Sequence, residues 1–118
     1  MPGISIHVVD VSRGVVAGGM LVELFAAGVG VEPCLVASGT IAANGTLPHA
    51  ALERRFEPGY FEARFHIADY YRAAVGASGT TPFLDVVIYR FGIAEPEAHY
   101  HLPMKCTPWG FSCFRGGA

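Results

Sequence analysis

Two side chains near the C-terminal end, His101 and Lys105, could act together on a carbonyl group. His99, His101 and Lys105 lie in segment 99–106, whose composition favours an extended strand. Side chains alternate along a strand, so these three are expected on one face, together with Pro103. An imidazole exchanges protons near neutral pH, and an amine confined beside imidazoles can serve as a cation, a base or a nucleophile. The segment therefore predicts a proton-transfer site.

His7 supplies a further imidazole from the start of the chain. It lies in segment 4–10, which is rich in β-branched residues and is expected to end at a turn that begins with Asp10. Val9 shares its face and is expected to add an apolar wall. If this strand adjoins segment 99–106, one imidazole can act as a base and another as an acid or hydrogen-bond donor.

The rest of the chain is dominated by short strand patterns. Asn44 and Gly45 predict a tight turn, because both tolerate positive φ. One helix is expected over 67–75, ended by Gly76. The segments expected to be strands are 20–26, 34–40, 60–66, 83–91, 99–106 and 109–115, with a possible short edge strand in 48–58. These patterns predict an all-β fold, a two-sheet β-sandwich with one short helix, as a single domain over residues 1–118.

Composition limits the possible partners. The chain has 118 residues, 52% of them apolar and 15% charged, which excludes a disordered chain. So much apolar content in a small domain predicts a subunit interface as well as a core. The net charge of −2, with scattered Lys and Arg, argues against nucleic acid as a partner, and no apolar run is long enough to cross a membrane.

Cysteine usage indicates the compartment. Cys34, Cys106 and Cys113 are odd in number and lack a CxxC spacing, which favours reduced thiols over a disulfide framework. The first residues also lack the basic and apolar regions of a signal peptide. A cytoplasmic location is therefore expected, and Cys106 and Cys113 are expected to be cross-strand neighbours.

Several segments resemble, in order, those of the transthyretin/5-hydroxyisourate hydrolase family. The resemblance covers nearly the whole chain, and its strength comes from the combination and spacing of the segments. They are HVVD at 7–10 with Arg13 and Gly14 following, Asn44 with Gly45, the stretch from Gly59 through the helix to Gly76, HYHLP at 99–103, TPWGFS at 107–112, and FRGG at 114–117, which resembles the Tyr-Arg-Gly-Ser terminus of the hydrolases.

The resemblance implies two four-stranded sheets packed face to face and a homotetramer, a dimer of dimers around a central channel. In the hydrolases, that channel holds the active sites, which open the ring of 5-hydroxyisourate, a product of urate oxidation, without an organic cofactor. Transthyretin itself lacks the histidines and binds thyroid hormone in the same channel. A small-molecule substrate is therefore expected here, with no nucleic acid or membrane partner.

Carried over residue by residue, the resemblance matches His7 and His101 to the two catalytic histidines. The family's Arg after the hairpin Gly falls on Thr46, the terminal Tyr on Phe114, and the terminal Ser on Gly117. Arg115 keeps the family's terminal Arg. Strand alternation places Lys105 on the face of His101, so Lys105 is the expected replacement for the missing guanidinium.

The expected site therefore combines catalytic and lining residues and contains no metal. The catalytic residues are His7, His101 and Lys105, and the substrate-binding residues are Thr46, Ser112, Phe114, Val9 and Arg115. A three-histidine metal site that includes His99 is the alternative use of this face. Ser112 is expected to line the channel rather than act as a nucleophile.

Three functions remain open at this point. The first is a 5-hydroxyisourate hydrolase or a close relative that hydrolyses another small cyclic substrate. The second is an enzyme repurposed for cyclisation, rearrangement or decarboxylation in a biosynthetic pathway, with Lys105 and the histidines in new roles. The third is a protein that binds an apolar ligand without turnover, a function that Phe114 in place of Tyr would favour.

Overall fold

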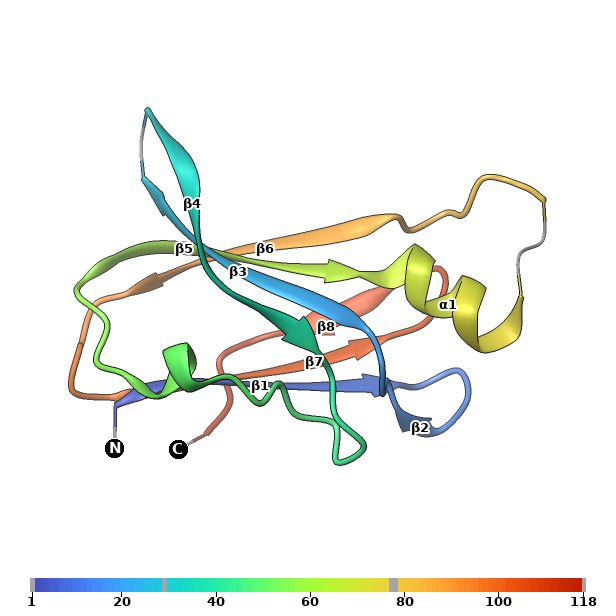
Figure 1. The fold of residues 1–118 in the computed structure, drawn as a ribbon, viewed down its shortest axis with the longest axis horizontal. Helices are drawn as coiled ribbons and strands as arrows, with labels where there is room; N and C mark the ends of the chain where they lie inside the picture. The colour runs from blue at the N-terminus through green and yellow to red at the C-terminus, as the bar shows by residue number, and fades with distance from the viewer. Residues whose placement is uncertain (1, 29, 77–78, 118) are drawn as a thin grey trace.

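Two four-stranded sheets pack face to face (Figure 1). The computed structural model describes residues 2–28, 30–76 and 79–117. The first sheet has the order β2-β1-β7-β8 and the second the order β4-β3-β5-β6. The strands are β1 (Gly3–Asp10), β2 (Val15–Val16), β3 (Leu21–Gly28), β4 (Val31–Thr40), β5 (Gly59–His66), β6 (Val86–Ile93), β7 (His99–Cys106) and β8 (Phe111–Cys113). The all-β two-sheet sandwich with one short helix is thus confirmed.

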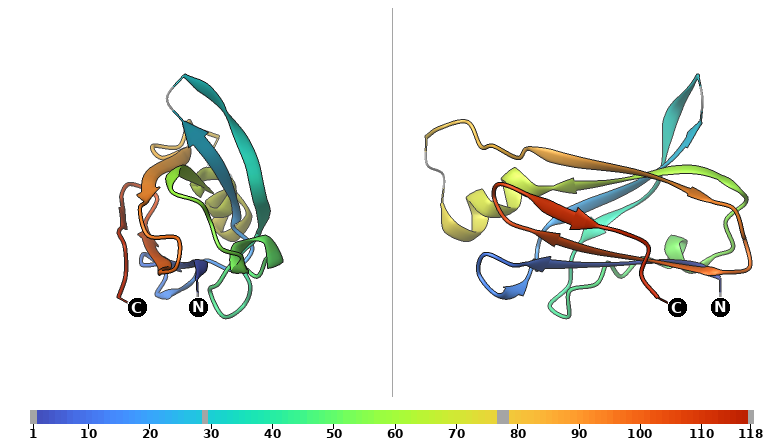
Figure 2. Two further views of the ribbon diagram at one scale, coloured as in Figure 1. Left: turned by 90° about the vertical axis from the view of Figure 1, so that its left-hand side faces the viewer. Right: turned by 180° about the vertical axis from the view of Figure 1, so that it is seen from behind.

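The pairing of β1 with β7 is the feature that positions the site. The two strands run parallel, although they lie at opposite ends of the chain, and Figure 2 shows them side by side from behind. In this register Ser5 lies opposite His101, and Val9 lies opposite Lys105. Segments 4–10 and 99–106 are therefore neighbours, as the site required.

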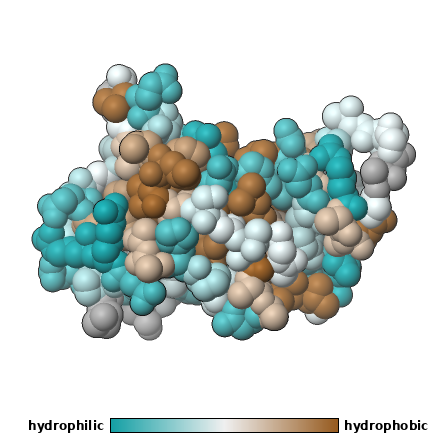
Figure 3. Space-filling view, viewed as in Figure 1, coloured by the Kyte–Doolittle hydropathy of each residue, from teal (hydrophilic) through white to brown (hydrophobic). Residues whose placement is uncertain are grey.

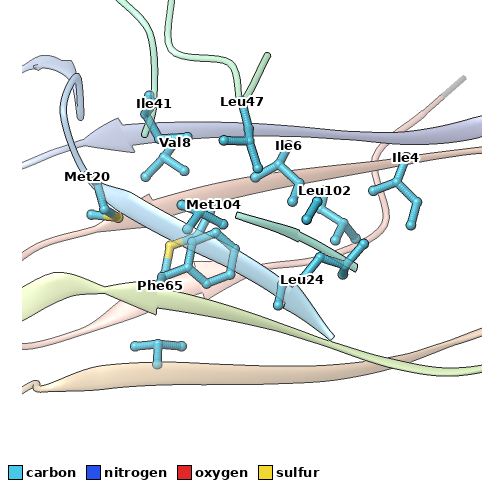
Figure 4. Close-up of a cluster of buried hydrophobic side chains, with 14 of the residues drawn as sticks. Ile4, Ile6, Val8, Met20, Leu24, Ile41, Leu47, Phe65, Leu102 and Met104 are labelled. Carbon is cyan, nitrogen blue, oxygen red and sulfur yellow. The ribbon is translucent and has the colours of Figure 1, made fainter. Parts of the chain in front are cut away.

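Alternation along β1 and β7 divides the side chains between the core and the outer face. Ile4, Ile6 and Val8 of β1 are almost completely buried, as are the even-numbered residues of β7, such as Leu102 and Met104. Figure 4 shows these side chains packed among residues of the second sheet. The odd-numbered residues of both strands therefore point away from the core.

The single α-helix, α1 (Ile67–Val75), has the predicted bounds and ends at Gly76. Gly76 has φ 89°, a left-handed conformation that suits glycine, and its N–H donates to the carbonyl of Arg72 at 3.0 Å. Tyr70 and Tyr71 are buried and point from the helix toward the end of β1.

Asp10, which is fully buried, joins the helix to β1. Its carboxylate accepts hydrogen bonds from the Tyr71 hydroxyl at 2.6 Å, the Tyr70 hydroxyl at 2.9 Å and the Ser12 hydroxyl at 2.7 Å. Burial alone raises the pKa of Asp10, but these hydrogen bonds outweigh it and hold the pKa below its usual value. Burial and the hydrogen bond to Asp10 raise the pKa of Tyr70 to about 12, so Tyr70 remains a donor.

Two predicted elements in the first half of the chain are corrected. Segment 48–58 holds no edge strand among its residues but the 3-10 helix η1 (Ala50–Glu53), because the His49 Nδ1 accepts the N–H of Ala51 at 3.1 Å and caps a helical turn. The strand expected over 34–40 begins earlier, since β4 starts at Val31.

The predicted strands of the second half are displaced or shortened. The strand expected over 83–91 is β6, which begins at Val86 and ends at Ile93. The strand expected over 109–115 is only the short β8. Its ladder with β7 stops after Cys113 pairs with Met104, because the next residue of β7 is Pro103, which has no N–H to donate. Cys106 and Cys113 lie on the neighbouring strands β7 and β8 as diagonal neighbours, since Cys106 is opposite Phe111 and Cys113 is opposite Met104.

Candidate active site

The predicted catalytic histidines lie on the outer face of the first sheet, in adjacent rows across β1 and β7. The first row contains Ser5 and His101, and the second contains His7 and Pro103. His7 and His101 are therefore diagonal neighbours on one face, and both are half-buried. The structure thus places the two predicted catalytic histidines on one face, in adjacent rows.

Ser5 was not predicted as a site residue, and it makes the closest contacts of this face. Its Oγ lies 2.6 Å from Nδ1 of His101 and 2.8 Å from Nε2 of His99. Since Nδ1 of His101 is engaged by Ser5, Nε2 is the nitrogen left to meet a substrate. Ser5 has the same strand parity as His7, but its partners become visible only once the parallel register of β1 and β7 is known.

The hairpin turn at Asn44 and Gly45 packs directly against the His7 side chain. Thr46 forms an isolated antiparallel bridge with His7, and Val8 donates its N–H to the carbonyl of Gly45 at 2.9 Å. A Cβ added at Gly45 would lie 2.5 Å from Nε2 of His7, so only glycine leaves room for the imidazole. The Thr46 hydroxyl donates to Oδ1 of Asn44 at 2.7 Å. Thr46 thus lies beside His7, with its hydroxyl donated within the turn.

Lys105 occupies the third row of the same face. It lies between Val9 on β1 and Ser112 on β8, which puts all three predicted residues in one row. Lys105 is exposed and has no ion-pair or hydrogen-bond partner among the described residues. Four residues along a strand correspond to about 13 Å, so Lys105 lies nearer to His7 than to His101.

The C-terminal segment returns along β7 and touches the His101 ring. The N–H of Gly116 donates to the carbonyl of His101 at 2.7 Å, and a Cβ at Gly116 would lie 2.8 Å from Cδ2 of that ring. Phe114 follows β8 and is 45% exposed. The Arg115 guanidinium, however, lies over the Tyr100 ring at 4.0 Å, and Tyr100 faces the core. The predicted substrate contact of Arg115 therefore has no support from this geometry.

The thiols and the metal-ligand types offer no second chemistry here. Burial raises the pKa of both Cys106 and Cys113 to about 11, so neither is an activated thiolate. In residues 2–28, 30–76 and 79–117, no group of three potential ligands is close enough together to hold a metal ion. The alternative three-histidine metal site thus has no ligand cluster in this part of the chain.

Two pockets differ in their relation to the imidazoles. A pocket of about 420 Å³ at the edge of β1 is lined by Ser5, His99, Thr46 and the residues of and before η1, including His49 and Glu53. A second pocket, of about 370 Å³, lies beside α1 and is lined by apolar side chains such as Phe83 and Trp109. Of these two, only the first is lined by histidines, His49 and His99. None of the described helices has the length and apolarity needed to cross a bilayer.

Comparison with known proteins gives a consistent result over the whole fold. The model of the HIUase/Transthyretin family matches residues 4–116. The chain is 37% identical over 116 residues to the 5-hydroxyisourate hydrolase of Deinococcus radiodurans, covering 98% of this chain and 96% of the relative. It is 34% identical over 114 residues to the 5-hydroxyisourate hydrolase of Halalkalibacterium halodurans, covering 96% of each.

Solved structures show the same likeness. A crystal structure of (S)-allantoin synthase matches with a TM-score of 0.86 and 30% identity over 98% of this chain, which spans only 43% of that chain. The 5-hydroxyisourate hydrolase of Klebsiella pneumoniae matches with a TM-score of 0.77 and 26% identity, over 99% of this chain and 100% of the other.

Proposed function

Because the chain belongs to the HIUase/transthyretin family, we propose that it is a hydrolase that opens a small cyclic substrate of the 5-hydroxyisourate type without a cofactor. The observation that carries this proposal is the common outer face of β1 and β7, where His7 and His101 lie in adjacent rows. The substrate class is supported by the two bacterial relatives, which are named 5-hydroxyisourate hydrolases. This chain matches 96% of the length of each.

Hydrolytic ring opening needs a base for the attacking water, and His101 is suited to this role. Ser5 engages its Nδ1 at 2.6 Å, which leaves Nε2 to take a proton from water as the water oxygen bonds to the substrate carbonyl carbon. The ring C–N bond then breaks, and the departing nitrogen takes up a proton. His7, one row away, is the donor for that nitrogen.

The developing oxyanion needs a positive group or hydrogen-bond donors. The family's Arg position holds Thr46, whose hydroxyl is donated to Asn44. Lys105 lies in the row beyond His7 and has no partner among the described residues, so it is the cation available to this face. A point-like ammonium does not replace a bidentate guanidinium, so we expect a preference for a substrate other than 5-hydroxyisourate itself.

A homotetramer, arranged as a dimer of dimers, would close the site. In one chain the face of His7 and His101 belongs to an outer sheet surface, and a second copy would exclude water from it. Large apolar side chains are exposed on the edge strands, Phe111 on β8 at 50% and Ile88 on β6 at 56%. Figure 3 shows further apolar areas, separated by polar ones, on the side seen in Figure 1. The three free cysteines favour a reducing compartment, such as the cytoplasm.

A second candidate function is a different reaction on a small carbonyl compound. It is favoured by the replacements at Thr46, Phe114 and Gly117 and by Lys105, the only lysine of the chain. Borohydride trapping in the presence of carbonyl compounds would label Lys105 if that amine forms a covalent adduct. Labelling that persists in Lys105→Met would exclude this candidate.

The decay of freshly generated 5-hydroxyisourate, followed by absorbance, tests the proposal. The protein should accelerate the decay, His7→Gln should remove most of the acceleration, and His66→Gln should leave it unchanged. His66 is a matched control because it lies on β5 in the other sheet, paired with Glu23. No acceleration by the parent protein would exclude 5-hydroxyisourate, and the absence of turnover across related cyclic amides would leave ligand binding as the function.

A further inference from the structure

The hydroxyl of Ser5 lies between two imidazoles that come from β7. Its Oγ is 2.6 Å from Nδ1 of His101 and 2.8 Å from Nε2 of His99. We propose that Ser5 is a positioning residue that joins His101 to His99 in a proton relay, and that this relay carries the proton taken up on the outer face to the pocket at the edge of β1. The proposal rests on the proposed hydrolytic function of His101.

A serine hydroxyl has one proton, and this fact constrains the three groups. Ser5 can donate to only one of the two ring nitrogens that face it, so the other nitrogen must carry a proton and donate to Ser5. The two imidazoles cannot both present a bare nitrogen to Ser5 without losing one of these hydrogen bonds. Their protonation states are therefore linked through Ser5.

One of the two neutral arrangements prepares His101 as a base. His101 donates its Nδ1–H to Ser5, and Ser5 donates its hydroxyl proton to Nε2 of His99. When Nε2 of His101 takes a proton from water, the Nδ1 proton moves to Oγ of Ser5, and the Oγ proton moves to Nε2 of His99. His101 is then neutral with its proton on Nε2, Ser5 is unchanged, and His99 holds the added proton as an imidazolium.

The pocket at the edge of β1 gives this proton an exit. His99 and Ser5 both line it, and its volume of about 420 Å³ accommodates water. A base enclosed by a second subunit could in this way be reset through the end of the face that Ser5 and His99 line.

Several charged or titratable groups surround the relay. Glu53 lines the same pocket as His99. The other titratable or charged groups near the relay are His49 in the pocket, His7 and Lys105 on the outer face, and Arg115 over Tyr100. A pH study of the relay must therefore compare variants that leave these groups in place.

Nitrogen-15 NMR of the imidazoles across pH tests the relay without turnover. In the parent protein, His99 and His101 should titrate together in two steps, with the resting proton of His101 on Nδ1. Ser5→Ala should uncouple them into two single titrations, Ser5→Thr should retain the coupling, and Ser38→Ala should change nothing. Ser38 is an exposed serine on β4 of the other sheet.

The same variants are then compared in the decay assay. Ser5→Ala should lower kcat by about tenfold or more, with little change in KM, and shift its pH profile, while Ser5→Thr restores the rate. Equal titration curves for parent and Ser5→Ala, or an unchanged kcat profile, would overturn the relay and leave the hydrolase proposal standing. Coupled titrations in a parent protein that hydrolyses no 5-hydroxyisourate would support the relay and reject the substrate.

Discussion

Strand β1 has a polar cluster near each end, and the fold surrounds the two clusters in different ways. At one end the carboxylate of Asp10 is fully buried and accepts hydrogen bonds from Tyr70, Tyr71 and Ser12. At the other end Ser5 lies half-buried between the rings of His99 and His101. Ser5 and Asp10 are only five positions apart on one strand, yet one cluster is closed inside the protein and the other lies on an outer face.

The difference follows from strand parity. Even-numbered residues of β1 face the core, so Asp10 must find all its partners inside the protein, and a buried carboxylate without them would be costly. Odd-numbered residues face outward, so the imidazoles beside Ser5 keep a ring nitrogen available for other molecules. The inner cluster around Asp10 is thus expected to determine the stability of the fold. The outer cluster, formed by Ser5, His99 and His101, is expected to determine the activity.

The largest effect is expected from His101→Gln. Loss of the base should lower kcat/KM on the ring-opening substrate by about a thousandfold, within the range for general acid–base groups. The unfolding free energy should change by less than about 1 kcal/mol, because the ring lies on the outer face. Kinetics of substrate decay and urea unfolding of the same sample measure both. A large loss of stability with retained activity would reverse the assigned roles of the two clusters.

The next largest effect is expected from Asp10→Ala. The change removes the carboxylate that accepts from Tyr70 and Tyr71 and leaves Tyr71 only the longer contact to the Cys106 carbonyl at 3.4 Å, which should cost about 3 kcal/mol of unfolding free energy. Urea denaturation measures this loss of unfolding free energy. Asp69→Ala is the control, because Asp69 is an exposed aspartate on α1, the helix that carries Tyr70 and Tyr71. The residual activity per folded molecule should equal that of the parent. Equal midpoints for the two variants would contradict the structural role of Asp10.

A smaller effect is expected from Lys105→Met. The Lys105 amine is expected to stabilise the oxyanion from the row beyond His7. Its removal should therefore lower kcat/KM by about tenfold, a smaller effect than removal of a hydrogen-bond donor in direct contact with the oxyanion. Lys105→Arg keeps the charge and should retain more of the rate. Steady-state kinetics distinguish these outcomes, and equal rates for the parent and Lys105→Met would remove Lys105 from the site.

The smallest effect is the pH dependence that the inner cluster adds to stability. The pKa of Asp10 is lower in the folded protein than in the unfolded chain, so the unfolded state binds more protons as the pH falls. This contribution is complete above the unfolded pKa of about 4 and is lost as the pH drops through the lower folded value. Asp10→Asn should flatten the unfolding free energy between pH 5 and pH 2, as urea titrations would show. An identical slope in the parent would contradict the lowered pKa.

Alternation and turn chemistry predicted much of the fold and of the outer face. The residues of β7 that share a face were predicted from parity alone, and helix α1 was predicted from its pattern and Gly76. The pairing of His7 with His101 came from the family resemblance, because strand patterns do not state which strands adjoin. The parallel register of β1 and β7 supplies that adjacency.

The features that were missed depend on contacts between distant segments. The role of Ser5 depends on two residues more than 90 positions away. Tyr70 and Tyr71 are buried, and their hydroxyls donate to Asp10, which the sequence indicated only as the start of a turn. Arg115 was expected to contact the substrate, whereas its guanidinium lies over the ring of Tyr100.

One comparison of decay rates tests whether the outer cluster, and not the inner one, determines activity. Freshly generated 5-hydroxyisourate is mixed with the parent protein, with His101→Gln and with Asp10→Asn, each at a pH and temperature where it is fully folded. We expect acceleration by the parent and by Asp10→Asn, and almost none by His101→Gln. Equal acceleration by the parent and His101→Gln, or a loss in Asp10→Asn as large as in His101→Gln, would contradict this separation.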